Sequence, residues 1–248
     1  MMQFEPIYLC IPLIVFCGSL IYAVFGFGDA LFSIPLLSYI IGVKTATPML
    51  TLNGFTLSTI MFLKHRHEIV WKDVWKILLA SLAGIPVGII FLKYGNEQAI
   101  RIVLGSVIVL VSLYNLFIHK RSVSLNSNWG FLFGWIAGIL GGALNTGGPP
   151  IVIYGTLRGW TPSQFVGSLQ GFFLPNDILI ICAQLLTGLT TFKVFMFYLM
   201  GLPFVLMALY TGNKLRKYVP EGKFNKYIFI LLLGIGLLFL SRSIAEIL

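Results

Sequence analysis

Charged residues are scarce in this chain. Only 10% of its 248 residues are Asp, Glu, Lys or Arg, whereas roughly a quarter of a soluble domain is charged. Hydrophobic residues make up 58%, and the mean hydropathy is +0.93. This composition excludes a soluble globular protein. Because a chain in lipid must satisfy its backbone polar groups internally, we predict an all-α polytopic (multi-pass) protein of the cytoplasmic cell membrane.

Signatures of several functional classes are also missing. The sequence has no HExxH, GxSxG or Walker A motif and no Cys-x-x-Cys pair, so we expect no enzyme activity, no catalytic residues, no metal and no cofactor. Its three cysteines lie inside apolar segments, where we expect small buried side chains. The seventeen Lys and Arg are scattered between apolar segments, which argues against a nucleic-acid partner.

Ten apolar segments follow one another along the chain, which predicts about eight to ten membrane segments. They span residues 7–25, 30–42, 46–63, 74–92, 101–118, 129–144, 149–157, 163–186, 192–211 and 226–241. Most are long enough to cross about 30 Å of hydrocarbon as a helix. Two are shorter, 30–42 and 149–157, and each follows a glycine-containing break, at 26–29 or at 145–150. We therefore expect a broken or re-entrant helix at each break.

The breaks occupy corresponding positions because the sequence repeats itself. Shifted by 117 positions, residues 42–96 match residues 159–213 at twelve identical positions without a gap, where so biased a composition gives about five by chance. The matched pairs include Gly84 with Gly201 and Pro86 with Pro203. We therefore predict two homologous halves, residues 1–122 and 123–248, within one membrane domain.

The loop charges indicate how the halves are oriented. If each short segment forms a hairpin with the helix before it, the halves are inverted repeats. One face then carries twelve Lys and Arg residues and the other carries five, whereas parallel halves would divide them nearly evenly. Because cytoplasmic loops carry an excess of Lys and Arg, we favour inverted repeats with both termini outside.

An inverted repeat with an interrupted helix in each half is typical of a secondary transporter, whose site lies at the repeat interface near the membrane midplane. Where a helix breaks inside the membrane, its free N–H groups and positive dipole end suit an anionic substrate. Glycine lets the backbone approach such a ligand directly. The candidate substrate-binding residues at the breaks are Gly26, Gly28, Asn145, Thr146, Gly147 and Gly148.

Two amide side chains extend this candidate site. Asn53 and Gln170 are equivalent in the repeat and lie inside apolar segments. Amide donors suit sulfonate or carboxylate oxygens, so we add both residues to the substrate-binding candidates. The alternative is that they hydrogen-bond neighbouring helices, a common use of such side chains in membrane bundles.

Asp29 and Asp177 are the acidic residues that lie within apolar segments. A carboxylate inside a membrane is by default a functional candidate, so we consider both as proton-coupling groups, with protons as the coupling ion. Asp29 is preferred because it adjoins the first break. The alternative is that each aspartate caps a helix. Arg158 either attracts anions toward the site or serves as an ordinary topological arginine.

Two glycine motifs resemble those of a known family. The first half resembles the first motif of the TauE/SafE-type sulfite and sulfonate exporters. The resemblance lies in Phe25-Gly26-Phe27-Gly28-Asp29-Ala30-Leu31 and Ile34-Pro35-Leu36. The second half is similar to that family's second motif. The matching residues are Gly134, Gly138, Gly141-Gly142, Gly147-Gly148-Pro149-Pro150 and Tyr154. Asp29 stands where many members have another glycine.

The resemblance implies a permease for small sulfur-containing or organic anions, such as sulfite, sulfonates or sulfoacetate. The residues themselves indicate a secondary transporter with an anion site, for which alternating access and proton coupling are our hypothesis. The expected partners are the anion, the lipid bilayer and protons. Two alternatives stay open, an anion channel and a membrane assembly or structural protein without transport activity.

The predicted topology is testable by cysteine labelling in intact cells. We expect the loops at 64–73 and 212–226 to react only after the membrane is permeabilised, because both carry the basic residues that favour the cytoplasm. Labelling that finds these two loops on opposite faces would contradict the inverted repeat.

Overall fold

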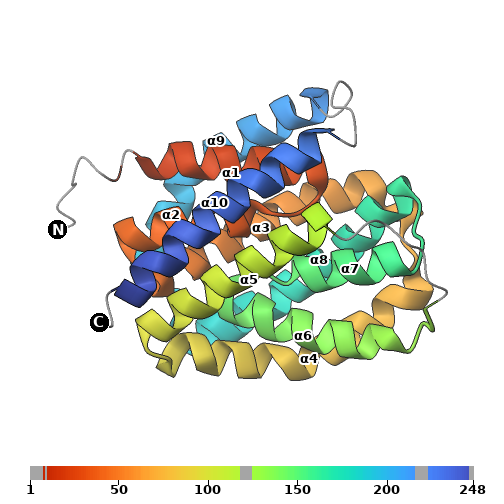
Figure 1. The fold of residues 1–248 in the computed structure, drawn as a ribbon, viewed down its shortest axis with the longest axis horizontal. Coiled ribbons are helices and arrows are strands. Elements are labelled where there is room, and N and C mark those ends of the chain that lie inside the picture. The colour runs from red at the N-terminus through yellow and green to blue at the C-terminus, as the bar shows by residue number, and fades with distance from the viewer. Residues whose placement is uncertain (1–7, 9, 118–124, 216–222, 246–248) are drawn as a thin grey trace.

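Ten α-helices make up the bundle in Figure 1, a computed structural model that describes residue 8 and residues 10–117, 125–215 and 223–245. The helices are α1 (Cys10–Phe25), α2 (Asp29–Ile41), α3 (Val43–His65), α4 (Trp71–Tyr94), α5 (Glu97–Phe117), α6 (Trp129–Leu144), α7 (Gly148–Leu157), α8 (Pro162–Leu186), α9 (Phe192–Leu215) and α10 (Lys223–Ala245), with the 3-10 turn η2 (Arg66–Glu68) before α4. The predicted boundary at 122 and 123 lies outside the described residues.

The all-helical, multi-pass architecture is confirmed, because each predicted apolar segment forms one of these helices. Five of them, α3, α4, α5, α8 and α9, are long and apolar enough to cross a membrane. By contrast, α1 and α6 have 16 residues each, fewer than the roughly 20 that a full crossing needs. Each of these two helices ends at one of the predicted breaks.

The outer surface of the bundle is apolar. Large hydrophobic side chains are exposed on α4, α5, α9 and α10, including Ile90, Leu110, Met207 and Leu238, which suits contact with lipid chains. The cysteine prediction was wrong. Cys10 and Cys182 are exposed and Cys17 is partly buried, because an apolar residue in a membrane helix can face lipid as favourably as it faces the core.

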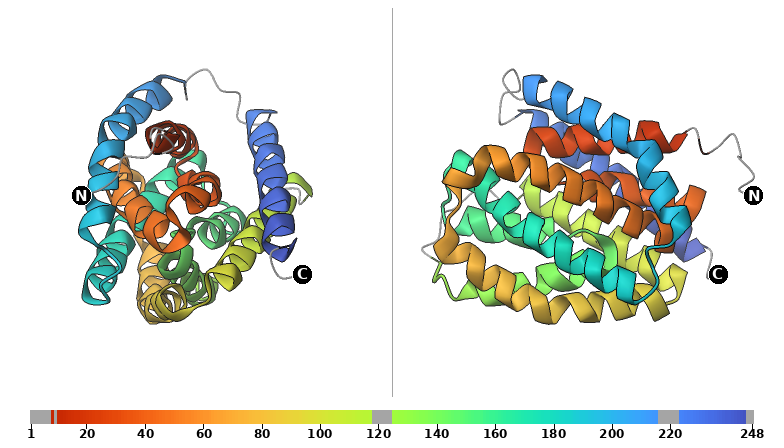
Figure 2. Two further views of the ribbon diagram at one scale, coloured as in Figure 1. Left: turned by 90° about the vertical axis from the view of Figure 1, so that its left-hand side faces the viewer. Right: turned by 180° about the vertical axis from the view of Figure 1, so that it is seen from behind.

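The helices α3 and α8 form the centre of the bundle and pack against each other. Over its most apolar stretch α3 is 61% buried and α8 is 50% buried, whereas α5 and α9 are each only 33% buried. The end-on view in Figure 2 shows α9 on one side of the bundle and α5 with α10 on the other. Residues of α3 and α8 are therefore the ones placed to line an internal site.

If the predicted repeat relates α1–α5 to α6–α10, the helix contacts occur in reciprocal pairs. The pair α1·α9 corresponds to α6·α4, and α3·α9 corresponds to α8·α4; all four pairs pack closely. The pairs α3·α8 and α5·α10 join equivalent helices to each other. Every one of these contacts links the first half of the chain to the second, so neither half forms a separate bundle.

A row of glycines brings the backbones of α4 and α6 into close contact. Gly134, Gly138 and Gly142 recur every four residues on α6, and each faces the backbone of α4. A Cβ on Gly138 would lie 2.8 Å from Ser81 Cα. Small residues at this spacing allow membrane helices to approach backbone to backbone. These second-half glycines therefore position the helix that ends at the second break.

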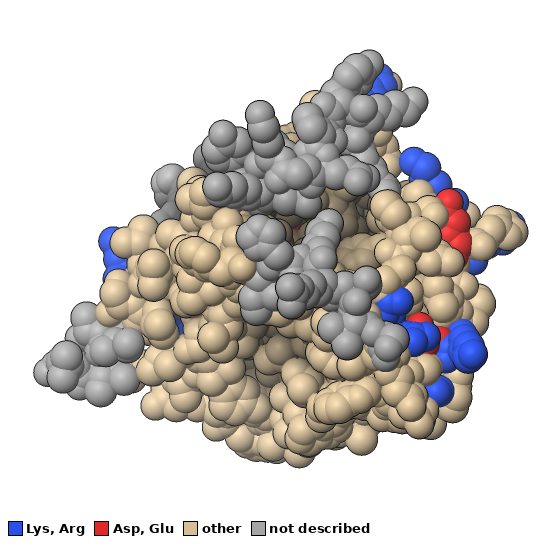
Figure 3. All heavy atoms as spheres, turned by 45° about the vertical axis from the view of Figure 1, so that its right-hand side comes forward, with Lys and Arg blue, Asp and Glu red and all other residues tan. Residues whose placement is uncertain are grey.

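Basic side chains gather at the end of the bundle where α3 leads into α4 (Figure 3). Lys64 Nζ donates to Asn213 Oδ1 at 3.2 Å, and Lys76 Nζ donates to Asn128 Oδ1 at 2.9 Å. Lys120, Arg121 and the basic residues at 216–222, which the topology prediction also assigned to this face, lie outside the described residues. At the opposite end Lys44 Nζ donates to the carbonyl of Lys93 at 2.9 Å.

The glycine row predicts a stability difference between two glycine-to-alanine variants. Gly138→Ala should lower the free energy of unfolding by roughly 1–3 kcal/mol, because its methyl group overpacks the α4 interface. Gly234→Ala is the matched control in α10, where a Cβ would meet nothing within 4 Å, and it should be neutral or stabilising by about 1 kcal/mol. Thermal unfolding in detergent compares them; equal melting temperatures would contradict the packing role.

Candidate functional site

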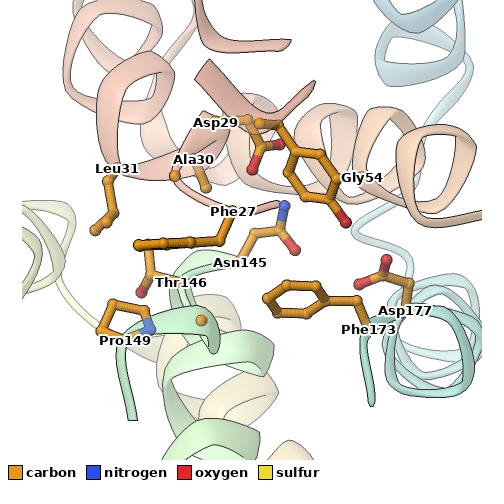
Figure 4. Close-up of a pocket in the computed structure, with 13 residues that line it drawn as sticks. Phe27, Asp29, Ala30, Leu31, Gly54, Asn145, Thr146, Pro149, Phe173 and Asp177 are labelled. Atoms are coloured by element: carbon orange, nitrogen blue, oxygen red, sulfur yellow. The ribbon is translucent and has the colours of Figure 1, made fainter. Parts of the chain in front are cut away.

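A small cavity lies between the two breaks (Figure 4). About 30 Å³ of it is open to the centre of a water-sized sphere, enough for roughly two water molecules. Its walls come from both halves of the chain. The lining residues are Tyr22, Phe27, Gly28, Asp29, Ala30 and Leu31 around the first break, Gly54 of α3, Asn145, Thr146, Gly148 and Pro149 around the second break, and Phe173 and Asp177 of α8.

The first break is a left-handed turn held by a side chain from the other half. Gly26 and Gly28 have φ angles of 83° and 103°, a conformation that favours glycine. The carbonyl freed at Gly26 accepts a hydrogen bond of 3.1 Å from Gln170 Nε2. Tyr22 donates its hydroxyl to Gln170 Oε1 at 2.6 Å. Gln170 thus satisfies the interrupted backbone and connects α8 to α1.

The second break turns at Asn145, which caps the end of α6. Its φ is 51°, and it is the one described residue other than glycine with a positive φ. Its N–H donates to the Gly141 carbonyl at 2.8 Å, while its side chain lines the cavity. The chain restarts as a helix at Gly148, with Pro149 and Pro150 in the first turn, where proline needs no N–H partner.

Asp29 and Asp177 both lie at the cavity. Asp29 is the first residue of α2, and its Oδ2 is buried without a hydrogen-bond partner among the described residues. Asp177 lies inside α8, where its Oδ2 accepts from Ser58 Oγ at 2.9 Å. The cap of α2 is Gly28 and that of α8 is Thr161. Neither aspartate therefore holds the helix-cap position that was the alternative interpretation.

The predicted substrate-binding residues divide into two groups. Gly28, Asn145, Thr146 and Gly148 line the cavity together with Asp29 and Asp177. The remaining four are not among the lining residues. Gly26 and Gln170 form the brace of the first break, and Gly147 packs against the Ala137 carbonyl of α6. Asn53 is buried, and neither of its side-chain polar atoms has a hydrogen-bond partner among the described residues.

Sequence reasoning missed the aromatic walls of the cavity. Tyr22, Phe27 and Phe173 line it, but in the sequence they are ordinary members of aromatic-rich apolar segments. Gly54 carried a signal, because it is identical to Gly171 in the repeat. In the structure Gly54 leaves space beside Asn145 and Asp177, since a Cβ there would lie 3.5 Å from Asn145 Nδ2 and 3.7 Å from Asp177 Oδ2.

Arg158 is engaged away from the cavity. Its Nε donates to Asp73 Oδ2 at 3.1 Å, and Trp160 Nε1 donates to the same oxygen at 3.1 Å. Arg158 also donates to the Leu125 carbonyl at 2.6 Å. Hydrogen bonding to Asp73 raises the pKa of the Arg158 guanidinium, so it stays charged. Arg158 therefore links the end of α7 to the start of α4. Most of its hydrogen-bond donors are used in these contacts and are not free to bind an anion.

Comparison with family models gives the deciding observation. Residues 11–239 match the model of the family described as sulfite exporter TauE/SafE. The chain belongs to this family. The match begins in α1 and ends in α10, so it covers both breaks and the cavity between them. Comparison with curated proteins and with solved structures finds no match.

Membership of the TauE/SafE family agrees with the architecture. The family is one of membrane transporters, and five described helices are long and apolar enough to span a bilayer. The protein is therefore an integral, multi-pass membrane protein of a transport family. This agrees with the expectation that it is not an enzyme.

The brace at the first break predicts opposite effects for two equivalent residues. Gln170→Leu should destabilise the protein by roughly 2–4 kcal/mol, because it leaves the Tyr22 hydroxyl and the Gly26 carbonyl buried without partners. Asn53→Leu should leave stability unchanged or higher, because it removes polar atoms that have no described partner. Thermal unfolding of the two variants tests this; an equal loss in both would contradict it.

Proposed function

We propose that this protein is a secondary transporter that moves small sulfur-containing or organic anions, such as sulfite, sulfonates or sulfoacetate, across the cytoplasmic membrane. The observation that carries the proposal is the meeting of two interrupted helices, one from each half, at one internal cavity. Transporters that alternate their access place the substrate at such a junction of repeats. Membership of the sulfite exporter family supports this class of substrate.

The cavity offers an anion several hydrogen-bond donors. The helices α2 and α7 both begin at its wall, at Asp29 and Gly148, so their first N–H groups and positive dipole ends lie close to a bound ligand. The Asn145 amide adds a side-chain donor. The small volume and the aromatic rings of Phe27 and Phe173 favour a compact anion over a large one.

Alternating access requires two halves that can exchange roles. The reciprocal helix pairs, in which α1·α9 corresponds to α6·α4, support an inverted repeat. Each half also has a 16-residue helix that ends at a break and packs against the short helix after it. We propose that these two pairs are re-entrant hairpins that approach the cavity from opposite faces, with both termini outside the cell.

A proton is the proposed coupling ion, carried at the cavity by Asp29 or Asp177. No Lys, Arg or His is among the described residues that line the cavity, so an anion there lacks a cationic partner. Either carboxylate would repel the anion when ionised and would donate a hydrogen bond to it when protonated. Loading the anion is therefore favoured by loading a proton.

A ligand screen combined with uptake tests the proposal. Sulfite, thiosulfate, taurine, sulfoacetate and simple carboxylates are added to the detergent-solubilised protein, and its melting temperature is measured. A ligand present at about 100 times its Kd should stabilise the folded state by about 2.7 kcal/mol. Anions that stabilise the protein should also enter liposomes that contain it, with saturating kinetics.

Gly148→Val should abolish both ligand stabilisation and uptake, and it should also lower the melting temperature without ligand because its side chain crowds Phe173 and Phe27. A Cβ at Gly148 would lie 3.3 Å from the Phe173 ring and 3.4 Å from Phe27 Cβ, so the larger side chain fills the cavity. Gly234→Val, on the open face of α10, is the matched control and should behave like wild type. Undiminished uptake by Gly148→Val would contradict this site.

A further inference from the structure

The cavity between the breaks contains two carboxylates that come from different halves of the chain. Asp29 is 7% exposed and Asp177 is 5% exposed, and both line the cavity (Figure 4). They are not equivalent in the repeat, since Asp29 begins α2 and Asp177 lies within α8. Each half of the chain therefore contributes one carboxylate to the cavity, but from a different position in its set of helices.

The start of α2 places its first N–H groups beside Asp29, but no Lys, Arg or His among the described residues that line the cavity balances two negative charges. The titratable group that faces them from α1 is Tyr22, whose hydroxyl donates to Gln170. From α3 come Gly54 in the wall and Ser58, which donates to Asp177. The second break adds Asn145 and Thr146, which are neutral.

The unpartnered Oδ2 of Asp29 is a second observation, besides the pair of carboxylates, that indicates a ligand in this cavity. This atom is buried and lacks a hydrogen-bond partner among the described residues, yet the carboxylate faces the cavity. A buried polar atom without a partner is unfavourable unless a ligand, a proton or a water completes it. An anion cannot complete an ionised oxygen, but it can accept a hydrogen bond from a protonated one.

We propose that the cavity loads its anion together with two protons, one on Asp29 and one on Asp177, and that all three cross the membrane in the same direction. This inference rests on the proposed function and extends it from one coupling group to a pair. Each carboxylate gains one proton from the side where the anion enters and releases it on the side where the anion leaves. No other bond changes.

The shared direction follows from the sign of the coupling between the ligands. Each proton removes a negative charge beside the anion, so proton and anion raise each other's affinity for the same cavity. Ligands coupled in this way bind together and are released together. The cavity therefore changes sides either with the anion and both protons bound or with none of them bound. Exchange of an anion against protons would need the opposite sign.

Two protons also fix the electrical signature of transport. A dianion that crosses with two protons moves no net charge, so the membrane potential should not drive its uptake. Replacing one aspartate by asparagine removes one proton from the cycle. The same dianion should then move one net negative charge, and uptake should respond to the potential.

The test uses the full-length protein in liposomes, with sulfite and sulfoacetate as probes at mildly alkaline pH, where both are dianions. A potassium gradient with valinomycin sets the membrane potential, and an internal pH dye reports protons. For wild type we expect two protons to enter with each anion and no effect of the potential. Asp29→Asn and Asp177→Asn should each carry one proton per anion and become potential-dependent, and the double variant should carry none.

Two controls separate coupling from folding. Glu97→Gln changes a carboxylate outside the cavity, at the opposite end of the bundle from the basic cluster, and should keep the wild-type stoichiometry. Exchange of labelled anion at equal concentrations on both sides should persist in the aspartate variants, which shows that they are folded and bind. Asn keeps the size of Asp, so the cavity keeps its shape.

The outcomes distinguish this inference from the proposed function. If neither probe nor any other anion in the screen enters the liposomes, the proposed function fails and this inference fails with it. If an anion enters but carries fewer than two protons, moves against protons, or follows a sodium gradient, the inference alone is wrong. An unchanged stoichiometry in Asp177→Asn would exclude Asp177 as the second carrier.

Discussion

A helix cannot stop inside a bilayer unless its freed backbone groups find partners, and the architecture depends on this constraint. The first break is stable because Gln170, from the other half of the chain, reaches the Gly26 carbonyl and accepts from Tyr22. The second break is stable because Asn145 adopts a left-handed conformation that returns its N–H to Gly141. Asp29 Oδ2, at the start of the helix after the first break, has no described hydrogen-bond partner and belongs to the cavity wall.

Close helix packing next to the second break fixes the position of that break. The glycines of α6 place that helix directly against the backbone of α4, and Gly147 continues the contact by packing on the Ala137 carbonyl. These glycines belong to the second-half motif that is similar to the TauE/SafE family's second motif. Most of them do not line the cavity. Close helix contact therefore accounts for most of these glycines, whereas Gly148 of the second break lines the cavity, where the proposed site would need direct access to the backbone.

The electrostatics of the cavity refine the idea of an anion site. The basic residues that give the chain its net charge of +9 lie at the ends of the bundle or outside the described residues, and Arg158 is paired with Asp73. An anion that reaches the cavity therefore meets carboxylates and neutral donors. In the proposed mechanism, recognition by neutral donors and protonated acids, with no fixed cation, would make the affinity for the anion depend on protons, so that a proton gradient could drive transport.

Hydropathy, glycine spacing and internal similarity determined the ten helices, the two breaks and the nomination of Asp29 and Asp177, because each of these is a property of neighbouring residues or of a direct comparison along the chain. The roles of individual polar residues were decided only by tertiary structure. Asn53 and Gln170 are equivalent in sequence, yet Gln170 braces a break 144 positions away while Asn53 has no described partner. Arg158 became structural because Asp73 lies opposite it, 85 positions away. A single sequence does not encode such long-range pairs in any local pattern, since they depend on which helices the packing brings face to face.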